Sequence, residues 1–98
     1  MSILDDAFIL AKDACDARAD AEARERLKTR YPGVKQEDLV SAYLKARALA
    51  DACYDFGDGC REKRTTDDEA IREMRRRFPG FSEATYRGAL SHGYFVSR

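Results

Sequence analysis

The residues of this chain that could bind a metal or act as nucleophiles are few and far apart. There is one histidine, His92, and there are three cysteines, Cys15, Cys53 and Cys60. Zinc sites usually hold their ligands in closely spaced pairs, whereas six residues separate Cys53 from Cys60. No Glu-x-x-His motif of a carboxylate-bridged metal site is present. We therefore expect no metal site and no cofactor.

The cysteines are expected to be free thiols in a reducing compartment, because their number is odd and their spacing forms no disulfide framework. This predicts a cytoplasmic protein. Cys15 and Cys53 both follow an Asp-Ala pair, and we expect both to be buried as small apolar groups. Cys60 follows a glycine-rich stretch, so it is predicted to lie in a loop and to be the most reactive thiol.

Catalytic motifs are missing from the chain. It has no glycine-rich phosphate loop, no Gly-x-Ser-x-Gly motif and no Cys/His/Asn series. Acidic residues gather in two places that could face each other as an acid–base pair: Asp13, Asp16 and Asp20, and Asp51, Asp55 and Asp58. Charges on a helix are most often its solvated side. We therefore expect no catalytic residues and no enzymatic activity.

Two basic runs each precede a Pro-Gly pair. The first holds Arg24, Arg26, Lys28 and Arg30, and the second holds Arg72, Arg75, Arg76 and Arg77. Cations in the last turn of a helix offset the partial negative charge of its unpaired carbonyl groups. The same residues are also of the type that binds phosphate.

The segment 80–90 resembles the turn and recognition helix of helix-turn-helix DNA-binding proteins. Gly80 stands in the turn, Ser82 and Thr85 follow it, and Arg87 comes one turn later. The resemblance implies a nucleic-acid-binding regulatory protein as an alternative function. Its phosphate contacts would be Arg72, Arg75, Arg76, Arg77 and Arg87.

The elements that position these residues contain an internal repeat. Pro32-Gly33 and Pro79-Gly80 lie 47 residues apart, each preceded by an aromatic residue and followed by an apolar one. The repeated units cover about 23–46 and 70–93. In this register three apolar pairs correspond: Leu27 with Met74, Tyr31 with Phe78, and Leu39 with Tyr86.

Apolar periodicity and capping residues predict four helices, over about 3–30, 36–54, 67–78 and 83–95. Ser2 and Thr66 begin capping boxes, and Ser82 is a further N-cap. Residues 56–59 are expected to form a turn because two glycines lie there. The predicted fold is one all-α domain over 1–98, built from two αα-hairpin (helix–turn–helix) units of which the first is longer. No apolar run approaches the roughly 20 residues of a membrane span.

The predicted function is a small helical protein-interaction module that self-associates as a homodimer or binds an unidentified protein. A first helix of about 28 residues would extend roughly 40 Å, farther than its neighbours can cover. Residues 1–59 hold nine Lys/Arg and twelve Asp/Glu, while 60–98 hold nine and six, which favours association between opposite halves. The expected dimer contact is one apolar stripe: Leu4, Phe8, Ala11 and Cys15.

Overall fold

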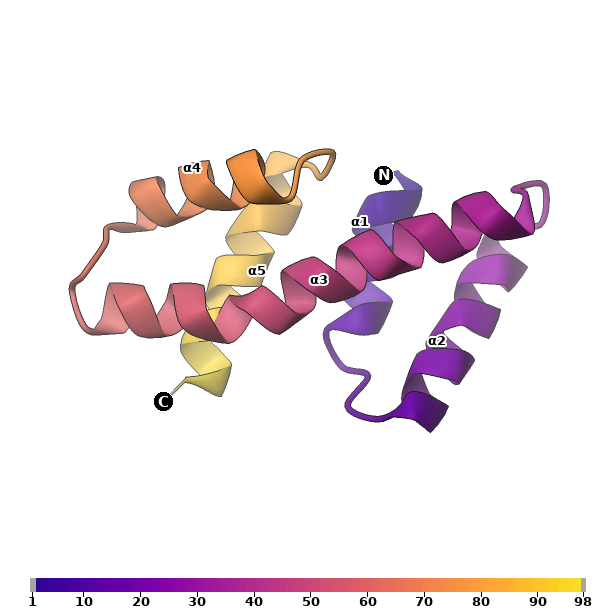
Figure 1. The fold of residues 1–98 in the computed structure, drawn as a ribbon, viewed down its shortest axis with the longest axis horizontal. Coiled ribbons are helices and arrows are strands. Elements are labelled where there is room, and N and C mark those ends of the chain that lie inside the picture. The colour runs from indigo at the N-terminus through magenta and orange to yellow at the C-terminus, as the bar shows by residue number, and fades with distance from the viewer. Residues whose placement is uncertain (1, 98) are drawn as a thin grey trace.

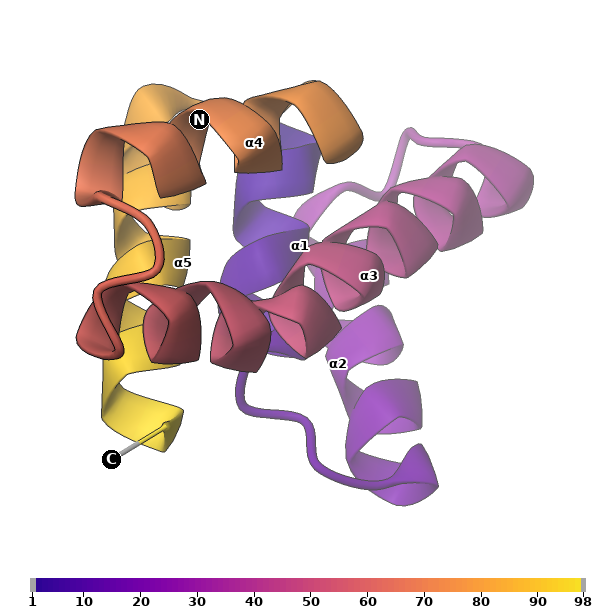
Figure 2. The same cartoon turned by 60° about the vertical axis from the view of Figure 1, so that its left-hand side comes forward.

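The computed structural model describes residues 2–97 and contains five helices in that range. They are α1 (Ile3–Ala11), α2 (Ala17–Arg30), α3 (Gln36–Arg61), α4 (Asp67–Arg77) and α5 (Glu83–Val96). The long α3 runs through the molecule, α1 and α5 cross behind it, and α2 and α4 lie toward its opposite ends (Figure 1). A view turned by 60° separates α5, α1 and α2 along α3 (Figure 2). The all-α class was predicted correctly, but the count of four helices was wrong.

The predicted first helix is broken into α1 and α2. The chain leaves the helix after Ala11 and starts again at Asp16, whose carboxylate accepts a hydrogen bond from the N–H of Ala19 at 2.7 Å. Arg47 of α3 donates through Nη1 to the carbonyl oxygens of Ala11 and Ala14, both at 2.7 Å. A side chain from another helix thus replaces the backbone donors that would have continued α1.

The second predicted helix continues through the expected turn at 56–59. Gly57 and Gly93 face each other where α3 crosses α5, and a Cβ atom on Gly57 would overlap the backbone of Gly93. These residues are therefore glycine because two helices touch there, and the chain does not turn. The extension makes α3 26 residues long, or about 39 Å.

The predicted helix starts are correct. The hydroxyl groups of Ser2, Thr66 and Ser82 each accept a hydrogen bond from the N–H three residues later. Ser2 and Thr66 complete capping boxes with Asp5 and Glu69. Local hydrogen-bonding chemistry therefore fixes where α1, α4 and α5 begin.

The cysteines only partly follow the prediction. All three are free, and Cys53 is buried as expected, but Cys15 is exposed in the α1–α2 loop. Cys60 is buried within α3, and burial raises its pKa. Burial also raises the pKa of Cys53 to about 12. The accessible thiol is therefore Cys15, and the expectation that Cys60 reacts first was wrong.

The two Pro-Gly turns begin with the same backbone geometry. Tyr31 ends α2 at φ −125° and ψ 64°, and Phe78 ends α4 at φ −130° and ψ 70°. Their N–H groups donate to the carbonyl oxygens of Leu27 and Met74 at 3.0 and 2.7 Å. The two residues of each corresponding pair are also buried to a similar degree. Leu27 and Met74 are fully buried, Leu39 and Tyr86 nearly so, and Tyr31 and Phe78 are half-buried.

Two consecutive carboxylates in the first turn of α1 each hold one of these turns. Asp5 accepts a hydrogen bond from the N–H of Ser82 at 2.9 Å. Asp6 accepts one from the hydroxyl of Tyr31 and forms an ion pair with Arg30 at 3.3 Å. Both carboxylates are buried, so α1 joins the two hairpins through a polar contact inside the fold.

Candidate functional site

The predicted dimer stripe is largely covered by the chain itself. Phe8 is 3% exposed and Ala11 is fully buried, while Leu4 packs against the core. The ring of Phe8 meets the edge of the Phe81 ring with centroids 6.5 Å apart. Only Cys15 of the stripe is exposed. The premise of an uncovered face on the first helix was wrong, because α1 is short and packs against α3.

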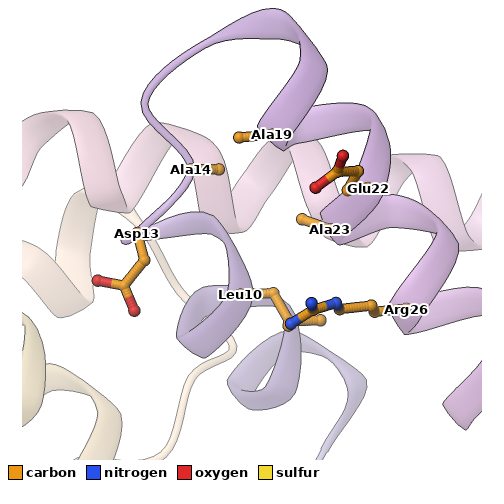
Figure 3. A pocket seen from close by; sticks show the side chains of 7 residues that line it. All are labelled: Leu10, Asp13, Ala14, Ala19, Glu22, Ala23 and Arg26. Carbon is orange, nitrogen blue, oxygen red and sulfur yellow. The ribbon is translucent and has the colours of Figure 1, made fainter.

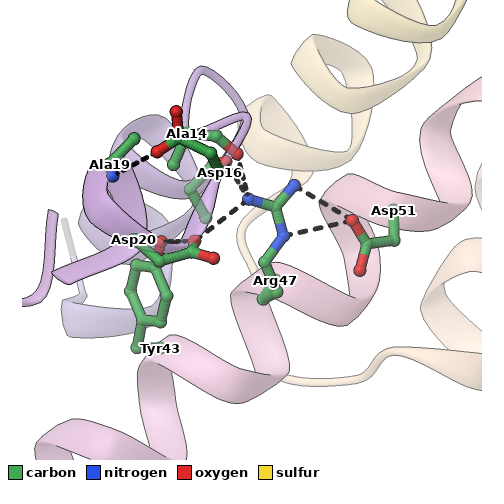
Figure 4. A network of polar contacts seen from close by, with 8 residues as sticks. Ala14, Asp16, Ala19, Asp20, Tyr43, Arg47 and Asp51 are labelled. Atoms are coloured by element: carbon green, nitrogen blue, oxygen red, sulfur yellow. Dashed lines mark hydrogen bonds and ion pairs between the residues drawn. The ribbon is translucent and has the colours of Figure 1, made fainter.

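One residue from each acidic group, Asp20 and Asp51, approaches the same arginine (Figure 4). Arg47 lies between Asp20 and Asp51, at N–O distances of 3.3 and 3.0 Å. Tyr43 donates its hydroxyl proton to Asp20 at 2.5 Å, and this hydrogen bond, with the charge of Arg47, lowers the pKa of Asp20. Burial and the same bond raise the pKa of Tyr43 to about 12. Asp20 is thus a fixed carboxylate that ties α2 to Tyr43 and Arg47 of α3.

A shallow hollow beside this network lies between α1 and α2 (Figure 3). Its volume is about 160 Å³, below the roughly 300–1,000 Å³ of typical ligand pockets. Its lining consists of alanines and charged side chains together with Leu10. It offers no buried polar group to orient a substrate.

Metal ligands do not gather anywhere in residues 2–97: no three His, Cys, Asp or Glu side chains lie close enough to hold an ion. His92 is half-buried on α5, and burial together with the charge of Lys12 lowers its pKa. The same stretch has no helix with the length and hydropathy that a membrane span requires.

The arginines of the nucleic-acid prediction lie near one another, but acidic neighbours occupy three of them. Glu83, in the first turn of α5, pairs with both Arg75 and Arg87. Arg76 pairs with a glutamate one turn earlier on α4. Arg72 is exposed on the same helix. Two of the four arginines of the basic run of α4 are therefore paired with carboxylates.

An apolar groove lies between α3 and the second Pro-Gly turn. Its volume is about 350 Å³. The lining residues are Lys45 and Ala48 from α3, Arg77 from the end of α4, and Phe78, Pro79 and Phe81 from the turn. Three of these residues are large and apolar, so the groove offers a surface that excludes water around an apolar side chain.

The turn that forms one wall of the groove is held from several sides. Tyr86 donates its hydroxyl proton to the carbonyl oxygen of Phe78 at 2.5 Å, and Asp5 binds the N–H of Ser82. Gly80 has φ 103°, and a Cβ atom there would lie 2.9 Å from Leu4. Only glycine fits this position without strain, so the wall is preformed.

The exposed side of α3 continues this groove. Leu44 is 58% exposed and lies one helical turn before Ala48, which is also exposed. Sequence reasoning missed Leu44. The available signal was its place outside the buried stripe of α3, where an apolar side chain has no partner within the fold.

Comparison of the chain with protein-family models, with curated proteins and with solved structures finds no match. The functional conclusion therefore rests on the geometry of the molecule itself.

Proposed function

We propose that this protein is a non-enzymatic helical interaction module that works as a homodimer, with the groove-bearing face of α3 as its contact surface. The observation that carries the proposal is the rigid apolar groove beside the exposed Leu44. Apolar side chains that a fold leaves exposed next to a preformed groove are typical of protein-binding surfaces.

The length of α3 leaves room for a contact of ordinary size. A standard protein–protein interface buries about 800 Å² on each partner, which is about an eighth of the 6118 Å² surface of this chain. With a length of about 39 Å, α3 has α1 and α5 on one side and solvent on the other (Figure 1). The long helix with one uncovered side is thus α3 and not the first helix.

Neither alternative has a comparable observation in its favour. For catalysis, Asp20 and Asp51 line an open polar hollow of about 490 Å³, but both carboxylates are already bound to Arg47. For nucleic acid, the carboxylate partners of Arg75, Arg76 and Arg87 would have to be displaced by phosphate. Nucleic-acid binding stays a prediction, and a gel shift on random duplex DNA that weakens steeply with salt would support it.

A cytoplasmic location is part of the proposal. It is supported by the three free thiols, one of which is exposed and would be open to oxidation outside a reducing compartment.

Light scattering over a concentration series tests the proposal. The mass should approach twice the 11.1 kDa of the single chain as the concentration rises, because association is governed by mass action. A constant mass of one chain at every concentration would refute self-association. Phe8→Asp serves as a contrast: it places a charge in the core, so it should unfold the protein and not yield a folded monomer.

A further inference from the structure

The groove is positively charged, which restricts the kind of partner that can bind in it. Its two ionisable lining residues, Lys45 and Arg77, are both cations. The guanidinium of Arg77 lies over the rings of Phe56 and Phe78, at 5.6 and 5.2 Å from the centroids. Neither cation has a carboxylate oxygen within 4.0 Å in the described part of the chain. The groove therefore suits an apolar anchor that has a carboxylate on either side of it.

The chain itself presents such an anchor. Leu44 lies on the exposed side of α3, and Glu37 and Asp51 are seven residues before and after it, which places them on nearly the same side of the helix. Both carboxylates are exposed, roughly 10 Å from Leu44 along the axis. Asp51 contacts Arg47 but keeps 68% of its side chain exposed, so it can accept a second partner.

Resting on the proposed function, we infer that the occupant of the groove is a second copy of this chain, anchored by Leu44 in a two-fold symmetric, antiparallel pairing of the two α3 helices. Anchor and groove share one face of α3, so one two-fold rotation fills both grooves and leaves none open for further copies. An axis close to Ala48 brings Lys45 of one copy opposite Asp51 of the other. The same axis places Leu44 opposite Ala52 of the other copy, about one helical turn from that copy's Ala48.

Small side chains at the proposed axis make a close approach feasible. Ala48 is exposed, and Ser41 and Ala52 lie near it on the same side of α3. The separation between packed helix axes depends on the side chains at the contact, and alanine and serine permit the lower end of that range. Leu44 can then reach the apolar wall that Phe78 and Pro79 form.

Cysteine cross-linking tests the position of the axis. In a Cys15→Ser background, which removes the exposed native thiol, Ala48→Cys should form an intermolecular disulfide under mild oxidation, because a residue on a two-fold axis meets its own copy. The matched control is Ala21→Cys, an exposed alanine on α2 away from the proposed contact. It should cross-link far more slowly at the same protein concentration.

Anchor and charge variants test the contact itself. Leu44→Asp should raise the dimer Kd at least roughly 30-fold, as loss of a buried anchor does, whereas Ile9→Asp on α1 should leave the Kd unchanged. Lys45→Glu should weaken the dimer, and Asp51→Lys in the same chain should restore it. Circular dichroism checks that each variant remains helical.

The outcomes separate this inference from the proposed function. A dimer that persists in Leu44→Asp, or that cross-links no faster through Ala48→Cys than through Ala21→Cys, would overturn the groove pairing and leave self-association standing. An unaltered chain that stays monomeric at every concentration would overturn both. The groove would then belong to a partner of different sequence.

Discussion

The two Pro-Gly turns begin with the same backbone angles but differ at their glycines and in where they hold a hydroxyl group. In the first unit the hydroxyl is on the turn, where Tyr31 donates to Asp6 of α1. In the second unit Phe78 occupies the equivalent place, and the hydroxyl is on the following helix, where Tyr86 donates back to the carbonyl of Phe78. The two units thus carry a tyrosine at different positions of the repeat, on the turn in the first unit and on the following helix in the second.

This exchange gives the two turns different roles. Both turns are bound to α1, but the first is bound through a side chain, the hydroxyl of Tyr31, and the second through the backbone N–H of Ser82. A phenylalanine on the turn has no polar group to satisfy, so the second turn can keep an apolar wall next to α3, where the groove lies. Two turns that begin alike thus carry a candidate binding face in one copy only.

The largest expected effect tests whether the two units are packed equally well. Leu27 and Met74 are both fully buried at corresponding positions. Leu27→Ala and Met74→Ala should each lower the free energy of unfolding by about 2–5 kcal/mol, since each leaves a cavity. Urea unfolding monitored by circular dichroism measures both losses. If one variant were nearly neutral, the two units would not be energetically equivalent.

A second, smaller difference separates the glycines of the two turns. Gly80→Ala should cost about 2–3 kcal/mol, because its φ of 103° is unfavourable for alanine and the added Cβ would press on Leu4. Gly33→Ala should change stability by less than about 1 kcal/mol, because nothing lies within 4 Å of the added atom. Thermal unfolding of the two variants compares them directly, and equal losses would contradict the difference between the turns.

The exchanged hydroxyls give a third comparison. Tyr86→Phe should lower the free energy of unfolding by about 1 kcal/mol, because the carbonyl of Phe78 loses its donor. The same variant should weaken the dimer, since it loosens one wall of the groove. Tyr31→Phe should destabilise the fold without changing the affinity of the dimer, because its hydroxyl lies at the other turn. Sedimentation analysis of both variants provides the measurement.

The last comparison concerns the extremes of pH. Burial disfavours the charged form of Asp5, but hydrogen bonds from Ser82, Thr85 and Ser2 outweigh burial and lower its pKa to about 2. Because this pKa is below that of the unfolded chain, the stabilisation is complete above about pH 4 and is lost as the pH falls toward 2. The hydrogen bond to Asp6 raises the pKa of Tyr31 above its ordinary value. The stabilisation that this bond gives the first turn is therefore lost as the pH rises through the raised pKa.

Asp5→Asn and Tyr31→Phe separate these two contributions. Asp5→Asn should flatten the acid side of the stability profile and Tyr31→Phe the alkaline side, each leaving the other side unchanged. Chemical unfolding over a pH series records the profile. A variant that altered both sides would show that the two turns are not held independently.

The sequence was sufficient wherever the cause was local. Ser2, Thr66 and Ser82 were predicted as caps from the residues around them, and the caps are formed as expected. The break after Ala11 was missed because its cause is Arg47, more than thirty residues away. Asp16, a good N-cap within an alanine-rich stretch, was the signal that could have shown it.

The candidate site was harder to predict from the sequence, because its residues too come from distant parts of the chain. The groove joins Ala48 to Phe78 and Pro79, which the fold brings together from distant parts of the chain. Similarly, the need for glycine at positions 57 and 93 arises only where α3 and α5 cross in the folded chain. The basic run was recognised, but the pairing of its Arg75 with Glu83 depends on how α4 packs against α5.

The adjacent carboxylates of α1 also set the order in which two tertiary contacts of the fold can form. The contact of Asp6 with Tyr31 spans 25 positions and can form once the first hairpin exists, whereas that of Asp5 with Ser82 spans 77. Closing the longer loop costs more chain entropy, and at roughly 5–20 residues per second a ribosome supplies Ser82 seconds after Tyr31. During synthesis, α1 therefore docks onto the first hairpin before the second can be attached to it.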